Sequence, residues 1–406
     1  MTIQLSHLIP GALNCMRNVA KIRPGEEVLI IADTTSDMDV TEAYKIAAEV
    51  EGGHVSVLTL TSACAGASSD EITHNALYGL WPKLAFSALS AADWCVNLTA
   101  FTDIHGMFGT GASYYGLNSM SDIWEMYETR MLSIVITNKE GLASDWATYP
   151  VRLLRYLGHM AHEHMLQAAG PDTTKAMVRV TDPQGTDISL EGFSIVTKSN
   201  LDPSAKAMPF YTFGTEMVGM KPMPNAEGVI VSTSIHTGWI PEMKMTLKDG
   251  RAVHVEGGGE AGIKWARDFD NGKDADSQGR ATAIFGSHPG PGVNWVEELM
   301  YGVHPKAFRT GYKYRWEGSD AFGAWNGGTR RSGTLHFGIG GGKDEWYRHR
   351  DLEVFFPTLT INGETIIDNG RLKVLDDPLV REEAARYGDP DDLLTEKWIP
   401  DCPPRD

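Results

Sequence analysis

The sequence predicts an α/β protein built from two parts. We expect a βαβ-type domain with a mainly parallel sheet over residues 1–174, and a β-rich α+β domain over residues 175–406. Short apolar runs alternate with helical patterns in the first part, which is typical of a parallel sheet with crossover helices. Turn dipeptides separate short alternating segments in the second part. The change of pattern follows Gly170-Pro171-Asp172.

The first part begins with an amphipathic helix, and a charge-bounded apolar run after it has the composition of a buried parallel strand. Asp39 is a suitable N-cap for the next helix, which ends at Gly52-Gly53 before a second strand. Together these segments form a βαβ unit. The expected elements are helices at 5–20, 40–50 and 150–169 and strands at 28–32, 55–60, 94–98 and 131–136.

The second part consists mainly of hairpins, with few and short helices expected. Asn362-Gly363 is a strong hairpin turn signal, and Lys248-Asp249-Gly250 is another turn. We interpret the acidic segment 268–274 as a surface loop, because its spacing misses the calcium-loop pattern. The expected hairpins join 178–181 to 188–191, 243–247 to 253–256 and 358–361 to 365–367; a strand is expected at 228–232, and helices at 260–269 and within 378–396.

Composition and charge exclude several classes of protein. The net charge of -17 disfavours nucleic-acid binding, which needs a surplus of Lys and Arg. No apolar run reaches the roughly 18 residues of a membrane helix, and the four scattered cysteines form no CxxC pair. A cytoplasmic protein without a membrane partner is therefore expected. The glycine motifs of dinucleotide and P-loop sites do not occur.

Metal-capable side chains concentrate in residues 288–351. His349 and Asp351 lie two residues apart, so in an extended segment both would point to one face. His336 and Glu298 complete a candidate set of two imidazoles and two carboxylates, which suits Fe(II), Mn, Co or Zn better than Ca or Mg. Glu297 would point away from Glu298, so at most one of the two is expected to be a ligand. Such a set can serve O₂ chemistry or activate a hydrolytic water.

A second histidine group lies on the expected helix at 150–169. His159 and His162 share a helix face, and His164 follows them. The spacing does not match HExxH, so we interpret this group as a solvated or interface face.

Four segments and their order resemble the 2,5-dihydroxypyridine dioxygenases, mononuclear non-haem Fe(II) enzymes that open a pyridine ring. More remotely, the chain resembles the aminopeptidase T metallopeptidases, which share that fold and carry two metals. The similarity extends to the βαβ part, through Ala91-Ala92-Asp93 and His105. The segments are 226–231, 256–261, 298–307 and 349–351.

The resemblance implies roles for individual residues. His349 and Asp351 match the metal-binding His-x-Asp of both groups. Glu298 falls where the dioxygenases place a histidine and the peptidases a glutamate, while His336 matches a metal histidine of the peptidases. Arg331 stands where the peptidases have a glutamate ligand, which argues against a second metal. His105 matches an active-site histidine of the dioxygenases, and we expect His105 and His304 to transfer protons.

Three functions follow as alternatives. We expect first an Fe(II) ring-opening dioxygenase that acts with O₂ on a hydroxylated pyridine or a related small aromatic. The second is a metal-dependent hydrolase, an aminopeptidase or amidase, with Zn, Mn or Co. The third is a binding or scaffolding protein that keeps the fold without the chemistry. The resemblance also implies a homo-oligomer.

Overall fold

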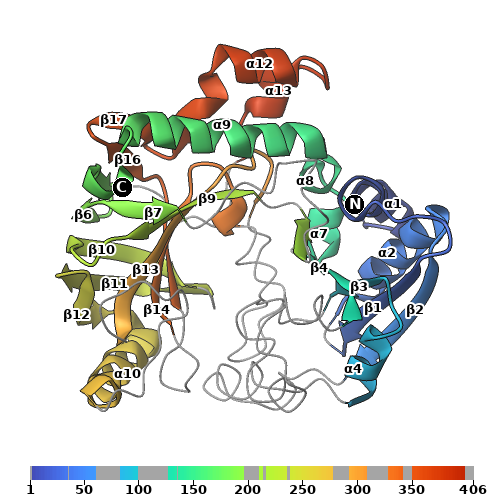
Figure 1. The fold of residues 1–406 in the computed structure, drawn as a ribbon, viewed down its shortest axis with the longest axis horizontal. Helices are drawn as coiled ribbons and strands as arrows, with labels where there is room; N and C mark the ends of the chain where they lie inside the picture. The colour runs from blue at the N-terminus through green and yellow to red at the C-terminus, as the bar shows by residue number, and fades with distance from the viewer. Residues whose placement is uncertain are drawn as a thin grey trace. The chain divides into compact units, whose positions relative to one another are not determined.

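The chain divides into two compact units in the computed structural model (Figure 1). One comprises Met1–Val151, Asp202–Thr215 and Thr310–Gly327, and the other comprises Arg152–Leu201, Glu216–Arg309 and Gly328–Asp406. The predicted domain bounds, 1–174 and 175–406, stay a prediction. The structure describes residues 2–34, 36–60, 83–98, 127–134, 136–195, 210–213, 216–235, 238–277, 292–308, 328–341 and 350–397.

The first unit is built on a five-stranded parallel sheet in the order β2-β1-β3-β4-β8. The second to seventh residues of β1 are all buried, as expected for an inner parallel strand covered on both faces. The four predicted strands are confirmed, whereas β8 was not predicted. The strands are β1 (Glu27–Asp33), β2 (His54–Leu60), β3 (Trp94–Asn97), β4 (Arg130–Ile134) and β8 (Phe210–Phe213).

Two details of the first helices differ from the prediction. The helix expected over 5–20 is an α-helix that continues as a π-helix. The N-cap of the next helix is Asp37 and not Asp39, because the Asp37 carboxylate accepts a hydrogen bond from the Asp39 N–H at 3.0 Å. The helices of this unit are α1 (Leu5–Asn14), η1 (Cys15–Ala20), α2 (Met38–Val50), α4 (Lys83–Leu89), α7 (Lys139–Leu142) and α8 (Asp145–Thr148).

The second unit contains a 13-stranded sheet whose central strands close on themselves. β10 pairs with β15 on one side and with β11 on the other, so the strands β10 to β15 form a closed antiparallel ring. The three predicted hairpins are confirmed. The strands are β5 (Met177–Thr181), β6 (Asp187–Glu191), β7 (Phe193–Ile195), β9 (Met217–Pro222), β10 (Glu227–Ile235), β11 (Gly238–Lys248), β12 (Arg251–Gly257), β13 (Gly292–Gly302), β14 (Leu335–Gly341), β15 (Arg350–Val354), β16 (Thr358–Ile361), β17 (Glu364–Asp368) and β18 (Arg371–Leu372).

Helices pack against the strands of this unit. On α9, the His164 imidazole lies 2.9 Å from the Asp377 carboxylate, which also caps α12, so this histidine joins two helices. No helix in the described ranges is long and apolar enough to cross a membrane. The helical segments are α9 (Val151–Ala169), η3 (Thr173–Lys175), α10 (Gly259–Ser277), η4 (Lys373–Asp376), α12 (Pro378–Ala384) and α13 (Pro390–Leu394).

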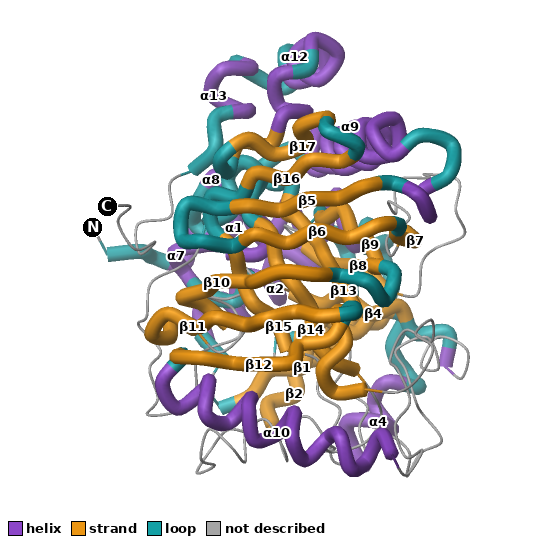
Figure 2. The backbone as a smooth tube through the Cα atoms, turned by 90° about the vertical axis from the view of Figure 1, so that its left-hand side faces the viewer, coloured by secondary structure: helices purple, strands orange, loops and turns teal. Residues whose placement is uncertain are grey.

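The expectation of short helices and of an acidic loop at 268–274 is wrong. These residues belong to α10, which has 19 residues and packs along β11, β12 and β13 (Figure 2). Trp265 and Phe269 stand one helical turn apart and are both buried. Asp268 is also buried and pairs with Arg350 of β15. A tertiary ion pair and apolar packing therefore outweigh the local loop-forming composition.

Candidate metal centre

Three neighbouring strands, β13, β14 and β15, bring predicted metal ligands together. In the strand register, Glu298 lies opposite Gly338, and Gly338 lies opposite Asp351. His336 precedes Gly338 by two residues, so both point to the same face of β14. One row across the sheet therefore holds two carboxylates on either side of a residue without a side chain, with an imidazole beside them.

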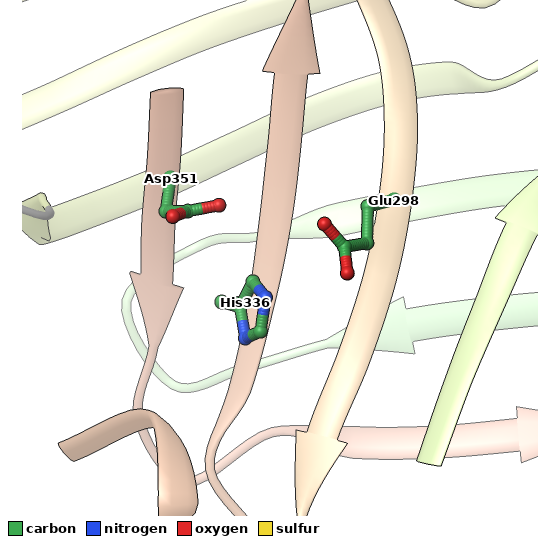
Figure 3. A group of neighbouring side chains, drawn as sticks. All are labelled: Glu298, His336 and Asp351. Carbon is green, nitrogen blue, oxygen red and sulfur yellow. The ribbon is translucent and has the colours of Figure 1, made fainter. Parts of the chain in front are cut away.

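Glu298, His336 and Asp351 form a compact buried group. Their exposed fractions are 7%, 3% and 5%. One ligand atom from each residue lies within 4.8 Å of the other two, and Figure 3 shows the carboxylates directed toward each other past the imidazole. Metal bonds to nitrogen and oxygen are about 2.0 to 2.2 Å long. Small side-chain rotations would therefore bring all three atoms onto one ion.

The sequence of β14 explains how the strand holds this group. Leu335, Phe337 and Ile339 alternate along it and are fully buried, which anchors one face of the strand in the apolar core. His336 and Gly338 occupy the alternate positions. Because Gly338 has no side chain, no Cβ atom stands between Glu298 and Asp351 in this row.

Lys221 of β9 adds a buried cation next to the group. Its ammonium lies 3.4 Å from the carboxylate of Glu297, and the Glu297 side chain is fully buried. Burial lowers the pKa of Lys221, while the charges of Glu297 and Glu298 act to raise it. Glu297 therefore has an ion-pair partner of its own and does not join the group that Glu298 forms with His336 and Asp351.

The backbone next to Asp351 is fixed by a second buried ion pair. Arg350 pairs with Asp268 of α10, and its guanidinium carbon lies 5.7 Å from the ring centres of both Trp265 and Phe269. These contacts combine a charge pair with cation–π stabilisation. They hold the start of β15, and with it Asp351, against α10.

Glu353 is a further buried carboxylate on the same face of β15 as Asp351. It stands directly opposite His336 in the register and accepts a hydrogen bond from the Ser234 hydroxyl. The hydroxyl of Ser232 donates to the Glu353 carbonyl oxygen at 2.7 Å. His336 therefore has Glu353 beside it in its own row of the sheet, and Glu298 and Asp351 in the next row.

The formal charges of this region favour a bound divalent cation. Four buried carboxylates, Glu297, Glu298, Asp351 and Glu353, lie on β13 and β15. Among the described residues, the charge of Lys221 acts on Glu297 and Glu298, and the charge of Arg330 acts on Glu298 and Asp351. Burying carboxylates is costly, and a divalent metal ion bound to Glu298 and Asp351 would offset part of that cost. The mixed nitrogen and oxygen donors fit a transition metal or zinc.

The other predicted site residues, His349, His105 and His304, are not in this group of three. His349 and His105 lie outside the described residues, so their roles stay predictions. His304 is fully buried, and its Nδ1 accepts a hydrogen bond from the Lys306 N–H at 3.1 Å. When neutral, its ring proton is therefore on Nε2. His304 is not part of the metal-capable group found among the described residues.

Arg331 occupies the position at which the resemblance placed a second-metal ligand in the peptidases. Its guanidinium donates to the carbonyl oxygens of Lys397 at 2.7 Å and Ser332 at 2.9 Å. A guanidinium cannot ligate a metal. The side chain is instead engaged in holding the chain near residue 397.

The sequence analysis missed three charged residues of the centre: Lys221, Arg330 and Glu353. Lys221 and Glu353 each interrupt an apolar stretch, in Gly219-Met220-Lys221-Pro222 and Leu352-Glu353-Val354-Phe355. A charge within a buried strand pattern was therefore an available signal. Arg330 carries no such signal, because it follows a segment without apolar periodicity.

Comparisons with known proteins identify the fold. No protein-family model and no curated protein matches the chain. The solved structure of 2,5-dihydroxypyridine dioxygenase from Pseudomonas putida KT2440 matches with a TM-score of 0.58, at 15% identity over 91% of this chain and 98% of that chain. AmpT from Thermus thermophilus, an aminopeptidase, matches with a TM-score of 0.52, at 13% identity over 90% and 99%.

This chain shares their fold. The likeness covers both units, and the predicted α/β architecture is confirmed. Identities this low establish the fold but do not transfer a reaction. The buried Glu298, His336 and Asp351 make a metal cofactor plausible on the chain's own residues. Together with two enzymes of the same fold, this group makes a metalloenzyme plausible.

Proposed function

We propose that the protein is a mononuclear non-haem Fe(II) dioxygenase that opens the ring of a hydroxylated pyridine or a related small aromatic. The supporting observation is a single group of ligands, Glu298, His336 and Asp351, on one face of three adjacent strands. Arg331 in place of a second-metal ligand favours one ion over two. A mononuclear site with open positions suits O₂ chemistry.

The proposed roles follow from the positions of the side chains. Glu298, His336 and Asp351 would hold Fe(II) together with the predicted ligand His349, and the metal would supply O₂ activation and substrate coordination. Lys221 offsets the charge of Glu297 and Glu298. His105 and His304 remain the proposed proton-transfer residues.

Oxygen uptake after anaerobic reconstitution tests this function. Protein loaded with Fe(II) under nitrogen should consume equal amounts of O₂ and substrate from a panel of hydroxypyridines, with loss of ring absorbance. His336→Ala should abolish the uptake. His254→Ala, at an exposed histidine of β12, should leave it unchanged. Turnover that proceeds equally well without O₂ would rule out a dioxygenase.

A metal-dependent hydrolase, an aminopeptidase or amidase, is the second candidate. It is favoured by Glu298, because two carboxylates and one imidazole form a donor set that also suits a zinc-activated water. Zn, Mn or Co would then restore cleavage of aminoacyl anilides under nitrogen. O₂-independent cleavage with no O₂ uptake on any hydroxypyridine would establish this candidate over the first.

A further inference from the structure

Arg330 ends a helical turn, of which the structure describes residues 328–330, and this turn packs against the metal-ligand strands. A Cβ atom added to Gly328 would lie 2.8 Å from Oε1 of Glu353, and one added to Gly302 would lie 2.5 Å from the Arg330 carbonyl. The Arg330 carbonyl also accepts a hydrogen bond from the His304 N–H at 3.1 Å. The turn is therefore fixed between the end of β13 and Glu353 of β15.

The guanidinium of Arg330 is enclosed but poorly supplied with acceptors. Its Nε is buried and has no hydrogen-bond partner among the described residues. Its NH1 contacts the sulfur of Met217, which is a weak acceptor. A buried donor without an acceptor carries a desolvation cost of about 1 to 3 kcal/mol. An oxygen ligand placed at this donor would remove that cost.

The charge of Arg330 acts on the metal-capable group. Burial lowers the pKa of Arg330 to about 10, and the charges of Glu298, Asp351 and Glu216 act to raise it. The Arg330 guanidinium therefore stays protonated at neutral pH. A divalent cation between Glu298 and Asp351 would offset the two carboxylate charges that act on the guanidinium, and Glu216 would remain the described carboxylate acting on it. Arg330 would then keep a buried donor, Nε, that an anionic ligand can satisfy.

We propose that Arg330 is a substrate-binding residue that makes the metal centre selective for aromatic ligands bound as anions, through a phenolate or carboxylate oxygen. The inference rests on the proposed metal centre and is independent of whether the reaction uses O₂. One oxygen of the ligand would coordinate the ion while an anionic oxygen accepts the Nε–H of Arg330. Charge-assisted hydrogen bonds of this kind are about twice as strong as neutral ones.

Lys221, the other cation of the centre, is less suited to this role. Its ammonium already lies 3.4 Å from the Glu297 carboxylate, and that carboxylate is fully buried with it. Arg331 is also engaged, through two backbone carbonyls. Arg330 makes no ion pair with any described carboxylate, and its charge is available to a ligand.

A pair of isosteric probes tests the proposal without turnover. Salicylate and salicylamide have the same shape and both chelate metals, but salicylate carries one more negative charge, on its carboxylate. Binding of each to the Zn(II)-loaded full chain is measured by calorimetry. We expect the wild type to bind salicylate at least tenfold more tightly. Arg330→Met should bring the ratio of the two affinities close to one, by weakening the binding of salicylate alone. Arg330→Lys should keep part of the preference for salicylate.

Metal content separates a binding role from a structural one. Arg330→Met should retain Zn(II) fully, because the change removes a positive charge near the ion. The control Arg179→Met removes an exposed arginine of β5 and should leave both affinities unchanged. An unchanged ratio in Arg330→Met or Arg330→Lys, or a wild type that does not prefer salicylate, would overturn the proposal.

Discussion

Strands β1 and β13 are both inner strands, but they bury different chemistry. In β1 the buried residues are apolar up to Asp33, which lies at the end of the strand and whose backbone N–H donates to the Ser36 hydroxyl at 2.9 Å. β13 buries Glu297 and Glu298 in the middle of the strand. β1 has the composition expected of a core strand, whereas β13 does not.

The difference indicates that β13 contributes less to stability than β1, because it carries the ligands of a binding site. Apolar burial in β1 stabilises its unit by about 25 cal/mol per Å². Buried carboxylates in β13 lower stability unless they are paired, because each loses its hydration. Lys221 compensates Glu297. Glu298, whose charge also acts on Lys221, lies with His336 and Asp351, where a cation can bind.

The largest effect should come from breaking the buried ion pair of β13. Lys221→Met leaves Glu297 buried without the ammonium at 3.4 Å, so the free energy of unfolding should fall by about 3 kcal/mol or more. Chemical denaturation measures this. The double change Lys221→Met with Glu297→Leu should recover most of the loss. Arg179→Met, which breaks the exposed pair with Asp187, should cost below about 1 kcal/mol.

If Lys221→Met costs no more than Arg179→Met, the charges of β13 are not desolvated as the structure indicates. The contrast with β1 would then lose its energetic basis.

Next in size is the loss of a metal ligand. Glu298→Gln should lower metal affinity by more than 100-fold, which is about 2.7 kcal/mol, since even changes to outer partners of ligands cost 10- to 100-fold. Competition with a chromophoric chelator measures the affinity. Asp33→Asn, at the buried carboxylate that ends β1, should leave it unchanged. Equal losses in the two variants would contradict the assignment of the metal centre to β13.

Glu216, just before β9, should give a smaller effect that depends on pH. Burial raises its pKa to about 7, while Arg155 and Arg330 act to lower it. Between its unfolded pKa of about 4.3 and pH 7, the folded state holds a proton that the unfolded state has released. Stability therefore falls as pH rises through this window. Between pH 5 and pH 8 the loss should be about 2 to 3 kcal/mol.

The difference in unfolding free energy between the wild type and Glu216→Gln isolates this titration. Relative to the variant, the wild type should be less stable at pH 8 than at pH 5. A constant difference across this range would show that the Glu216 carboxyl titrates normally.

The smallest effect should follow from filling the space at Gly338. Gly338 does not have a positive φ, so alanine fits the backbone, but its methyl group would stand between Glu298 and Asp351. Metal affinity should fall about tenfold, or about 1.4 kcal/mol. Ile339→Val, on the opposite face of β14, should reduce stability by about 0.5 to 1.5 kcal/mol without changing metal affinity. If Gly338→Ala binds the metal as tightly as the wild type, the ion does not lie between Glu298 and Asp351.

Local sequence patterns predicted most of the architecture. Apolar runs such as Val28–Ala32 and turn signals such as Asn362-Gly363 predicted four of the five parallel strands and all three hairpins. The strand β8 escaped prediction because parallel pairing joins segments that are distant in sequence. Residues 268–274 were misassigned because Asp268 is stabilised in α10 by Arg350, a partner more than 80 positions away.

The sequence by itself determined the candidate ligand types and the alternation that sends His336 and Gly338 to one face of a strand. The resemblance to the peptidases added a reason to expect one metal ion, because Arg331 stands where they have a glutamate ligand. Tertiary structure alone decided that Glu298, Gly338 and Asp351 form one row across three strands, since register is set by pairing between strands. It also decided which buried charges are paired, because Coulomb interactions depend on distances in space and not on separation along the chain.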